Sequence, residues 1–223
     1  MNTLTKTNKA GEKISPAVIR RLPRYRSYLS DLQNSGIERI SSDKLSGMMG
    51  YTASQIRQDL NNFGGFGQQG YGYNVALLNN EIAEILGLNK HYKMVIVGAG
   101  HLGTAITNYI SVYRREFEIR AMFDIKRELI DTEISGIRVR DIADLEAVLK
   151  EEHIDIGVIT TSRKSAQAIA DVFVEGEIYG IWNFAAIDVS VPEHVALKVV
   201  HLSDSLHELV YYVNNRDNPS FQK

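Results

Sequence analysis

The chain has 223 residues, of which 44% are hydrophobic and 23% charged, so it is long enough for one large or two modest globular domains. It contains no cysteine, which excludes disulfides, thiolate metal sites and cysteine nucleophiles. No apolar run is as long as a membrane span and no signal-peptide pattern opens the chain. We therefore expect a cytoplasmic protein that has neither a metal nor a membrane as a partner.

Charge is distributed unevenly along the chain. Residues 1–75 carry ten Lys and Arg against five Asp and Glu, a balance of +5, whereas the remaining residues carry fifteen against twenty-two, a balance of −7. A basic front segment on an acidic body suggests that only the front segment meets a polyanion. Chance clustering of charge is the alternative.

Residues 1–14 are polar, and we expect them to be disordered. Ser15-Pro16 then predicts the start of a helix, with Ser as the N-cap and Pro at the first helical position. This helix runs to about Asn34, before Gly36, and its apolar stripe is Ile19, Leu22, Tyr25, Leu29 and Leu32. Its arginines form either a solvated face or a contact with a phosphate backbone; they are Arg20, Arg21, Arg24 and Arg26.

Two short helices follow. The first begins at Ser41-Ser42-Asp43, carries Leu45, Met48 and Met49, and ends at Gly50. The second begins after Thr52, and Thr52-x-x-Gln55 has capping-box spacing. Its inward residues are Ala53, Ile56 and Leu60, and its outward residues are Ser54, Gln55, Arg57 and Gln58, which can hydrogen-bond base edges or phosphates. Two short helices joined by a tight glycine turn predict a helix-turn-helix.

Residues 61–73 contain five glycines interleaved with aromatic residues, so this segment cannot be a helix. We predict a β-hairpin wing anchored by Phe63, Phe66, Tyr71 and Tyr73; a flexible linker is the alternative. Val75–Leu86 is amphipathic, with Gly87 where a C-cap belongs, and we expect this helix to join two domains.

The stretch KMVIVGAGHLG, residues 93–103, has a β-branched run followed by the spacing G-x-G-x-x-G. Apolar residues then recur at helical spacing, at Ala105, Ile106, Tyr109 and Ile110. A strand, a glycine turn and a helix N-terminus in this order are typical of a dinucleotide site. The predicted strand 117–123 ends at Asp124, 21 residues beyond Gly103, where the ribose-binding acid is expected. A tight turn that binds no ligand is the alternative.

The rest of the chain alternates between predicted strands and helices. The predicted elements are an extended pair over 134–141, a helix over 142–152, a strand over 155–160, a helix over 165–174, strands over 178–184 and 195–201, and a last helix over 202–213. This alternation predicts a parallel, doubly wound sheet with right-handed crossovers. Two strand ends are expected to line the cofactor crevice: Thr160-Thr161-Ser162 and Asn183-Phe184-Ala185. Ordinary loop polar groups and a core Phe are the alternative readings.

We therefore predict an α/β protein made of an N-terminal winged helix-turn-helix domain, a doubly wound Rossmann domain and a C-terminal helix. The expected divisions are a disordered tail over 1–14, the winged-helix domain over 15–75, a connecting helix and linker over 76–92, the Rossmann domain over 93–201, and the C-terminal helix with its tail over 202–223.

With this order of elements the sequence resembles the Rex family of bacterial redox-sensing transcriptional repressors. The matching stretches cover most of residues 16–215; they are RLPRYRSYL, SSDKLSGMMGYTASQIRQDLNNFGGFGQQGYGYNV, EILGLNKHYKMVIVGAGHLGTAI, FD at 123–124 and NFA at 183–185. The resemblance implies a homodimer that binds a pseudo-palindromic DNA operator when NADH is scarce. NADH would close the two Rossmann domains and release the DNA. The C-terminal helix would be exchanged between subunits and serve dimerisation.

The site residues follow from the motifs and the resemblance together. We expect Gly98, Ala99, Gly100, His101, Leu102 and Gly103 to cradle the pyrophosphate of NADH or NAD⁺, although an exposed loop histidine is an equal reading of His101. Asp124 should bind the adenine ribose, and Tyr109 should lie near the nicotinamide. The remaining expected cofactor contacts are Thr160, Thr161, Asn183, Phe184 and Ala185. The expected DNA contacts are Ser54, Gln55, Arg57 and Gln58 in the major groove, with Lys44, Gln68 and Gln69 on the backbone or in the minor groove.

The chain also departs from the family pattern. Gln58 and Gln68-Gln69 stand where the family usually has basic residues, and fewer cations predict weaker, less salt-sensitive DNA binding. Ser27 and His201 replace the Arg and Asp that in the family form a switch network with the Tyr at position 109, and Ala186 replaces a Pro. A regulator with a lost or altered NADH response is therefore an open alternative. Lys126 and Arg127 beside Asp124 also leave an NADP preference open.

An NAD-dependent oxidoreductase is the least expected function. No Tyr is followed four residues later by Lys, which removes the Tyr/Lys pair of short-chain dehydrogenases, and little chain remains for a substrate domain. We expect no enzyme and no catalytic residues.

Overall fold

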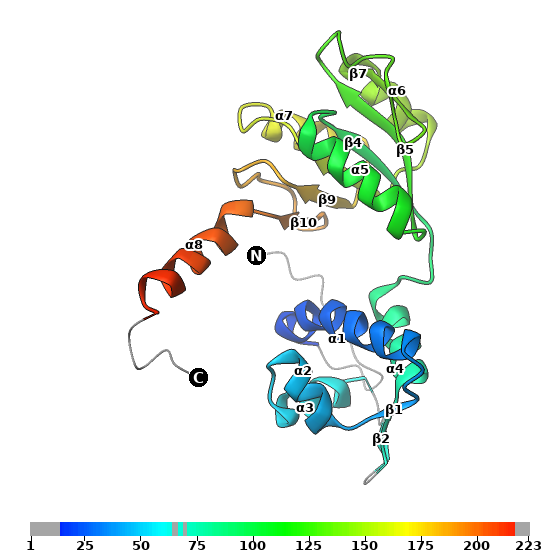
Figure 1. Cartoon of the computed structure of the whole chain (residues 1–223). Helices are drawn as coiled ribbons and strands as arrows, with labels where there is room; N and C mark the ends of the chain where they lie inside the picture. Colours follow the sequence, from blue (N-terminus) through cyan, green and yellow to red (C-terminus); the bar gives the residue numbers. More distant parts are fainter. Residues whose placement is uncertain (1–13, 64–66, 69–70, 217–223) are drawn as a thin grey trace. The chain divides into compact units, whose positions relative to one another are not determined.

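The structure is a computed structural model, and it describes residues 14–63, 67–68 and 71–216. The chain forms two compact units that divide between Lys90 and His91, and each is described by itself. Figure 1 shows a largely helical first unit and a second unit built around a sheet. The expected disorder of the N-terminal tail lies outside the described residues, except at Ile14, which is buried in the core of the first unit.

Four helices form the body of the first unit: α1 Pro16–Asn34, α2 Ser42–Met49, α3 Ala53–Asn61 and α4 Val75–Leu86. Each begins at a side-chain oxygen that accepts a backbone N–H of the first turn; the four N-caps are Ser15, Ser41, Thr52 and Asn74. Gly50 and Gly87 end α2 and α4 in the left-handed conformation, which explains why glycine stands at both positions. The predicted helix-turn-helix is therefore confirmed as α2, a short turn and α3.

Three short strands complete the first unit: β1 Arg39–Ile40, β2 Gly67–Gln68 and β3 Gly72–Asn74, in the antiparallel order β1-β3-β2. Strands β2 and β3 form the predicted wing, whereas β1 was missed because two residues give no alternation to detect. Phe63 and Tyr73 are buried, but Tyr71 is 69% exposed, so the expectation that Tyr71 anchors the wing is wrong. Tyr71 lies in the turn before β3 and does not face the core. Phe66 lies outside the described residues.

Helix α4 corrects the expected domain division. We expected residues 76–92 to connect two domains, but α4 packs against α1 and belongs to the first unit. Leu78 and Ile82 are buried in the same core as Leu22, Tyr25 and Leu29 of α1. The helix is amphipathic because it packs on α1, and the first unit extends to Lys90.

The second unit contains a seven-stranded sheet in the order β10-β9-β8-β4-β5-β7-β6. Its strands are β4 Tyr92–Val97, β5 Phe117–Asp124, β6 Glu133–Ile134, β7 Ile137–Asp141, β8 Ile156–Ile159, β9 Gly180–Asn183 and β10 Ala196–Val199. All neighbours pair in parallel except β6, which pairs antiparallel with β7. From β4 the chain adds β5 and β7 on one side and then β8, β9 and β10 on the other, which confirms the predicted doubly wound Rossmann sheet.

Helices cover the sheet of the second unit, and each face of the sheet has its own hydrophobic core. The core on one face includes Ile106 and Ile110 of α5 His101–Tyr113. The second includes residues of α6 Leu145–Glu151 and α7 Ala166–Glu175, among them Val148 and Phe173. A short 3-10 helix, η1 Ile142–Asp144, leads into α6, so the predicted helix over 142–152 is two consecutive elements.

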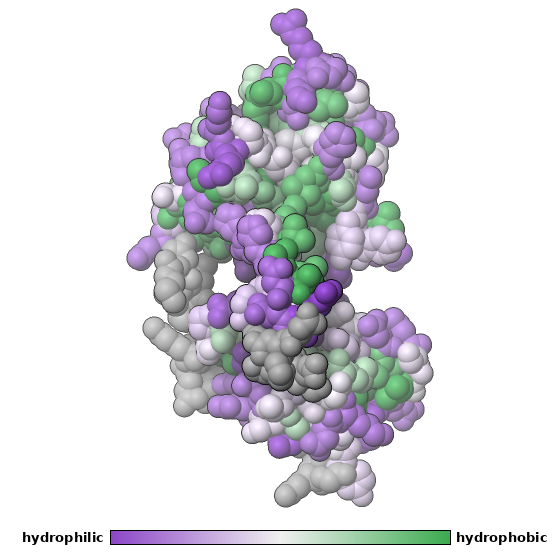
Figure 2. All heavy atoms as spheres, turned by 60° about the vertical axis from the view of Figure 1, so that its left-hand side comes forward, coloured by the Kyte–Doolittle hydropathy of each residue, from purple (hydrophilic) through white to green (hydrophobic). Residues whose placement is uncertain are grey.

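Helix α8 Leu202–Asn214 is exposed along its whole length. Figure 2 brings α8 forward and shows apolar side chains exposed on this side of the molecule. One face of the helix carries exposed apolar residues at helical spacing, namely Leu202, Leu206, Leu209, Val210 and Val213. Across the described ranges of the chain, no helix has both the length and the apolar character needed to cross a membrane.

The place of α4 in the first core yields a test. Ile82→Ala removes a fully buried side chain and should lower the free energy of unfolding of the first unit by about 3 kcal/mol. Leu77→Ala, on the same helix but 65% exposed, should change it by less than about 0.5 kcal/mol. Urea titration read by hydrogen exchange within residues 16–63 measures both variants. Equal losses in the two variants would contradict the assignment of α4 to this core.

Candidate functional sites

The turn after β4 depends on two glycines. Gly98 has φ +108° and its N–H donates to the Phe123 carbonyl at 2.7 Å. A Cβ on Gly103 would collide with the carbonyl oxygen of Gly98, so the first turn of α5 can lie against the strand end only if residue 103 has no side chain. By contrast, a Cβ on Gly100 would meet nothing within 4 Å. The space over Gly100 is therefore open to a ligand.

The N-terminus of α5 faces the same turn. Gly100 is its N-cap and supplies no side-chain acceptor, so the N–H groups of the first turn remain available to an anion. His101 is the first helical residue and is exposed, whereas Ala99 is buried and Leu102 is half-buried. Leu102 can thus contribute only its backbone N–H to a phosphate, whereas the Ala99 N–H is already donated to Asp124. His101 is the one residue of the turn with a polar side chain to offer.

Asp124, at the end of β5, is held by the backbone on both oxygens. Its Oδ2 accepts the Ala99 N–H at 2.7 Å and its Oδ1 accepts the Lys126 N–H at 2.9 Å. A carboxylate oxygen has two acceptor sites, so each oxygen keeps one for a sugar hydroxyl. The contacts fix the orientation of the carboxylate directly beside the glycine turn.

A cavity of about 350 Å³ opens at this edge of the sheet and joins the predicted elements. Its lining includes Gly98, Gly100 and Asp124 together with Thr160 and Thr161, which follow β8. The Thr160 hydroxyl donates to the Gly98 carbonyl at 2.8 Å, and Thr161 Oγ1 is buried with no partner within the described part of the chain. The cavity has features that fit a dinucleotide. The open approach to the backbone and the uncapped helix N-terminus suit the phosphates, and the fixed carboxylate and the unpartnered hydroxyl suit a ribose.

Sequence reasoning missed part of this cavity. The additional lining residues come from the segment after β5, from η1 and from the start of α7; they are Ile125, Ile142, Ser165, Ala168 and Ile169. Most are apolar residues of ordinary helices, so no motif marks them. Only their place behind the carboxyl ends of β5 and β8 brings them to the site.

The predicted residues 183–185 do not reach this cavity. Asn183 is fully buried, donates to the Ile187 carbonyl at 2.8 Å and accepts the Ala185 N–H at 2.9 Å, so its amide builds its own loop. The Phe184 ring lies 4.5 Å from the Trp182 ring, and Ala185 is buried. Their contact with a cofactor stays a prediction that this arrangement does not support directly.

Tyr109 also lies away from the glycine turn. It stands eight residues into α5, about 12 Å along the helix from His101. It lines a second cavity of about 390 Å³ near the starts of the strands, with Met94, Phe117 and Trp182. Its hydroxyl accepts from Arg114 at 2.7 Å. Tyr109 therefore does not line the cavity around Asp124, and its contact with the nicotinamide stays a prediction.

The glycine turn yields a matched pair of variants. Gly103→Ala should destabilise the second unit by about 2 kcal/mol or more, because its methyl group meets backbone that cannot move. Gly100→Ala should fold with unchanged stability, since its φ of −70° suits alanine, but should lose about tenfold or more in dinucleotide affinity. Urea denaturation and calorimetric titration with NADH test both variants. Unchanged affinity in Gly100→Ala would show that no phosphate approaches there.

In the first unit, α3 has two opposite faces. Ser54, Arg57 and Gln58 are exposed, and Asn61 extends the same stripe at helical spacing. Ile56, Asp59 and Leu60 are buried on the other face. Asn61 was missed because the glycine-rich segment that follows obscures where the helix ends. Three of the four predicted groove-facing residues thus lie on the solvent face.

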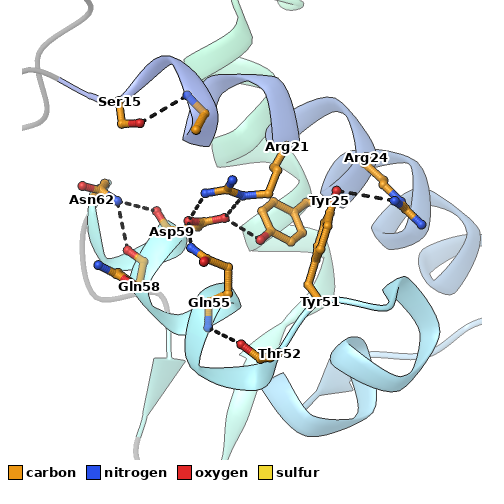
Figure 3. A network of polar contacts seen from close by, with 11 residues as sticks. Ser15, Arg21, Arg24, Tyr25, Tyr51, Thr52, Gln55, Gln58, Asp59 and Asn62 are labelled. Carbon is orange, nitrogen blue, oxygen red and sulfur yellow. Dashed lines mark hydrogen bonds and ion pairs between the residues drawn. The ribbon is translucent and has the colours of Figure 1, made fainter. Parts of the chain in front are cut away.

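Gln55 is the exception, and Figure 3 shows why. Its side chain reaches toward Asp59, and its Nε2 donates to Asp59 Oδ1 at 2.8 Å. The Thr52 hydroxyl accepts the Gln55 backbone N–H at 3.1 Å, so half of the predicted capping box forms while the Gln55 side chain turns inward. The expectation that the Gln55 side chain points outward is therefore wrong for this structure, and its contact with DNA stays a prediction. The Gln55 amide donates instead to the buried Asp59 carboxylate, a partner that was not predicted from the sequence.

Asp59 also binds two residues of α1. Arg21 donates to Oδ2 through Nε at 2.5 Å and to Oδ1 through Nη2 at 2.7 Å, and the Tyr25 hydroxyl donates to Oδ2 at 2.6 Å. Burial disfavours the charged carboxylate, but these hydrogen bonds outweigh burial and hold the pKa of Asp59 below its ordinary value. Arg21 thus serves inside the unit, so the alternatives of a solvated face or a phosphate contact do not apply to it.

The other predicted DNA contacts lie at several places on the first unit. Arg57 donates to the buried Ser42 hydroxyl at 2.7 Å and has four further N–H donors. Lys44 is exposed on α2, and Gln68 lies in β2, whereas Gln69 is outside the described residues. Arg24 lies over the Tyr51 ring at 5.1 Å. Among the described residues no cluster of three or more His, Asp or Glu could hold a metal ion.

The Asp59 contacts predict acid sensitivity. Because the pKa of Asp59 is lowered by folding, its contribution stabilises the first unit above the unfolded value of about 4 and is lost as pH falls through the folded value. Asp59→Asn should lower stability at neutral pH but flatten its decline on acidification. Hydrogen exchange within residues 16–63 across this range measures the effect, with Asp31→Asn at an exposed position of α1 as the matched control. A decline as steep as that of the wild type would contradict the account.

Together these features define a class of protein: a DNA-binding helix-turn-helix unit and wing joined to a Rossmann unit with a dinucleotide site. Comparisons with known proteins agree. Residues 13–61 match the family model described as putative DNA-binding protein N-terminus, and residues 89–187 match the CoA binding domain model.

The relatives identify the family. The chain is 51% identical over 195 residues to the redox-sensing transcriptional repressor Rex of Clostridium acetobutylicum, covering 87% of this chain and 91% of the relative. Rex of Clostridium beijerinckii is 48% identical over 207 residues, covering 93% and 98%. The chain therefore belongs to the Rex family of redox-sensing transcriptional repressors, and its close relatives are repressors, not enzymes.

Solved structures give the same assignment. The Rex-family repressor RSP in complex with β-NAD⁺ and operator DNA matches with a TM-score of 0.85 at 50% identity, covering 92% of this chain and 94% of that one. RSP in complex with β-NADH matches with a TM-score of 0.85 at 47% identity, covering 92% and 96%.

Proposed function

We propose that this protein represses transcription by binding operator DNA when NADH is scarce and releases the DNA when NADH binds the second unit. The observation that carries the proposal is the presence in one chain of a candidate DNA-binding face and a candidate nucleotide cavity. The first unit presents a polar helix face beside a wing, and the second presents a glycine turn beside a fixed carboxylate. The family relationship supports this coupling.

The chemistry of the ligand follows from the cavity. The N-terminus of α5 and the open space at Gly100 suit a pyrophosphate, and Asp124 suits the ribose hydroxyls of NAD⁺ or NADH. The nicotinamide of the bound cofactor would supply the difference between the redox states, while the residues of this chain bind and orient the nucleotide. Lys126 also lines the cavity, so a preference for NADP remains the alternative at this position.

The relation of RSP to its ligands suggests the mechanism. RSP was crystallised with β-NAD⁺ and operator DNA together, and separately with β-NADH. We infer that this chain likewise has two arrangements with different affinities for NADH and for DNA. A ligand that prefers one arrangement shifts the population toward it and lowers the affinity for the other ligand.

We also infer that the protein is a cytoplasmic homodimer. A palindromic operator requires two copies of α3, and helix α8 offers an exposed apolar face that a second subunit can cover. The functional divisions then become a DNA-binding unit to residue 90, the nucleotide-binding unit from residue 91, and α8 with its tail as the dimerisation element.

A specific observation keeps the second candidate function open. His201 stands where the family has an acid, and its Nε2 lies 3.3 Å from Asp188 Oδ1. Ser27, at the position of the family's Arg, is exposed on α1. The residue pair that transmits the cofactor state in the family is therefore replaced, which favours a regulator with an altered NADH response.

Titration of the operator complex with NADH separates the candidates. The probe is the duplex that the wild-type protein enriches from a random-sequence pool. NADH should weaken binding about tenfold or more, and NAD⁺ should weaken it much less, by fluorescence anisotropy. Arg57→Ala should weaken operator binding while leaving NADH affinity unchanged, because the two sites lie in different units. A flat NADH titration would instead establish the unresponsive regulator.

A further inference from the structure

The buried carboxylate of Asp59 uses its full hydrogen-bonding capacity. Oδ1 accepts from Arg21 Nη2 and Gln55 Nε2, and Oδ2 accepts from Arg21 Nε and the Tyr25 hydroxyl. Two oxygens offer about four acceptor sites, and four donors occupy them. The side chain is 1% exposed, so neither water nor DNA shares in these contacts.

These donors come from two helices that are far apart in the sequence. Arg21 and Tyr25 lie one turn apart on α1, and Gln55 lies one turn before Asp59 on α3. The contact therefore fixes both the position of α3 relative to α1 and its rotation about its own axis. Apolar contacts of Ile56 and Leu60 hold the same face, but they set no hydrogen-bond direction.

The rotation of α3 decides which side chains can reach DNA. With Asp59 and Gln55 on the inner face, the opposite face presents Ser54, Arg57, Gln58 and Asn61. Figure 3 shows that Gln58 points away from the carboxylate toward which Gln55 reaches. A helix rotated by one residue would carry a different set of side chains into a groove.

We propose that Asp59 is a positioning residue for DNA recognition, and that Gln55 is a strut which, one turn earlier on the same helix, holds the carboxylate in place for Arg21 and Tyr25 of α1. Base reading is then left to the opposite face of α3, which carries Ser54, Arg57, Gln58 and Asn61. This proposal rests on the proposed function, since it assumes that α3 enters a groove of the operator. The proposal assigns different roles to two glutamines of α3. Gln55 has a structural role, and Gln58 contacts the bases.

Two matched substitutions test the division. Gln55→Met and Gln58→Met each replace an amide by an apolar side chain of similar length on α3. Each variant and the wild type select duplexes from a random-sequence pool, and their affinities for the wild-type motif and for a scrambled duplex are then measured. Hydrogen exchange within residues 16–63 shows whether the first unit of each variant is folded, and NADH affinity shows the same for the second unit.

For Gln55→Met we expect the same selected motif as for the wild type, with affinity for that motif about fivefold lower, because the carboxylate that binds α1 loses one of the donors that orient it. Affinity for the scrambled duplex should stay within about twofold, because phosphate contacts do not require the exact rotation of the helix. For Gln58→Met we expect the selected base to change or relax at one position in each half-site. A change of base preference in Gln55→Met, or wild-type affinity in that variant, would overturn the proposal.

A double-mutant cycle shows whether Gln55 acts through Asp59. In an Asp59→Asn background, Gln55→Met should cost less than about twofold, because the strut has already lost its charged partner. Tyr25→Phe removes a donor to the other oxygen and leaves the contact between Gln55 and Asp59 in place, so in that background Gln55→Met should keep its fivefold cost. A fivefold loss in the Asp59→Asn background as well would overturn the coupling. If the wild-type protein selects no motif at all, the proposed function fails first, and that result is distinct from a changed motif in Gln55→Met.

Discussion

The close contact between Gly103 and the carbonyl of Gly98 is the constraint on which the nucleotide-binding unit depends. It allows the N-terminus of α5 to lie directly against the carboxyl end of β4. That placement leaves first-turn N–H groups free for an anion and brings the turn within hydrogen-bond distance of Asp124 on the next strand. Thr160 closes the other side by donating to the same carbonyl. A side chain at residue 103 would separate these groups.

In the first unit the corresponding constraint is a set of side-chain hydrogen bonds between α1 and α3. The carboxylate of Asp59 holds α3 against α1 through charged and hydroxyl donors, although burying a charge is costly unless it is paired. An apolar pair could supply as much stability. What the hydrogen bonds add is a direction, and we propose that this direction helps to set the rotation of a helix that reads base edges.

The sequence predicted the larger features well because they have strong local signals. N-caps such as Ser15 and Thr52, the glycines that end helices, and the spacing from Gly98 to Asp124 all lie where the structure requires them. The two-residue strand β1 and the buried Asp59 could not be predicted, since each depends on a partner far away in the chain. The same reason explains α4: an amphipathic pattern shows that one face is buried but not against what.

The candidate sites divide in the same way. The glycine turn and Asp124 are encoded by one short motif, whereas Tyr109 and Asn183 were expected from the resemblance or from strand ends and point elsewhere within this chain. Tyr109 lines a second cavity, and Asn183 is consumed by its own loop. Gln55 was expected to point outward because its position in the helical pattern is near the boundary between the two faces. The pattern does not show that a polar side chain at this boundary has a buried partner.

In the proposed mechanism, NADH binding at the glycine turn and DNA binding at α3 oppose each other. Thermodynamic linkage requires that this opposition be reciprocal. Calorimetric titration of NADH into the protein alone, and into the protein saturated with its selected duplex, measures it directly. The account predicts that DNA weakens NADH binding by the same factor by which NADH weakens DNA binding. Equal NADH affinities with and without the duplex would contradict it.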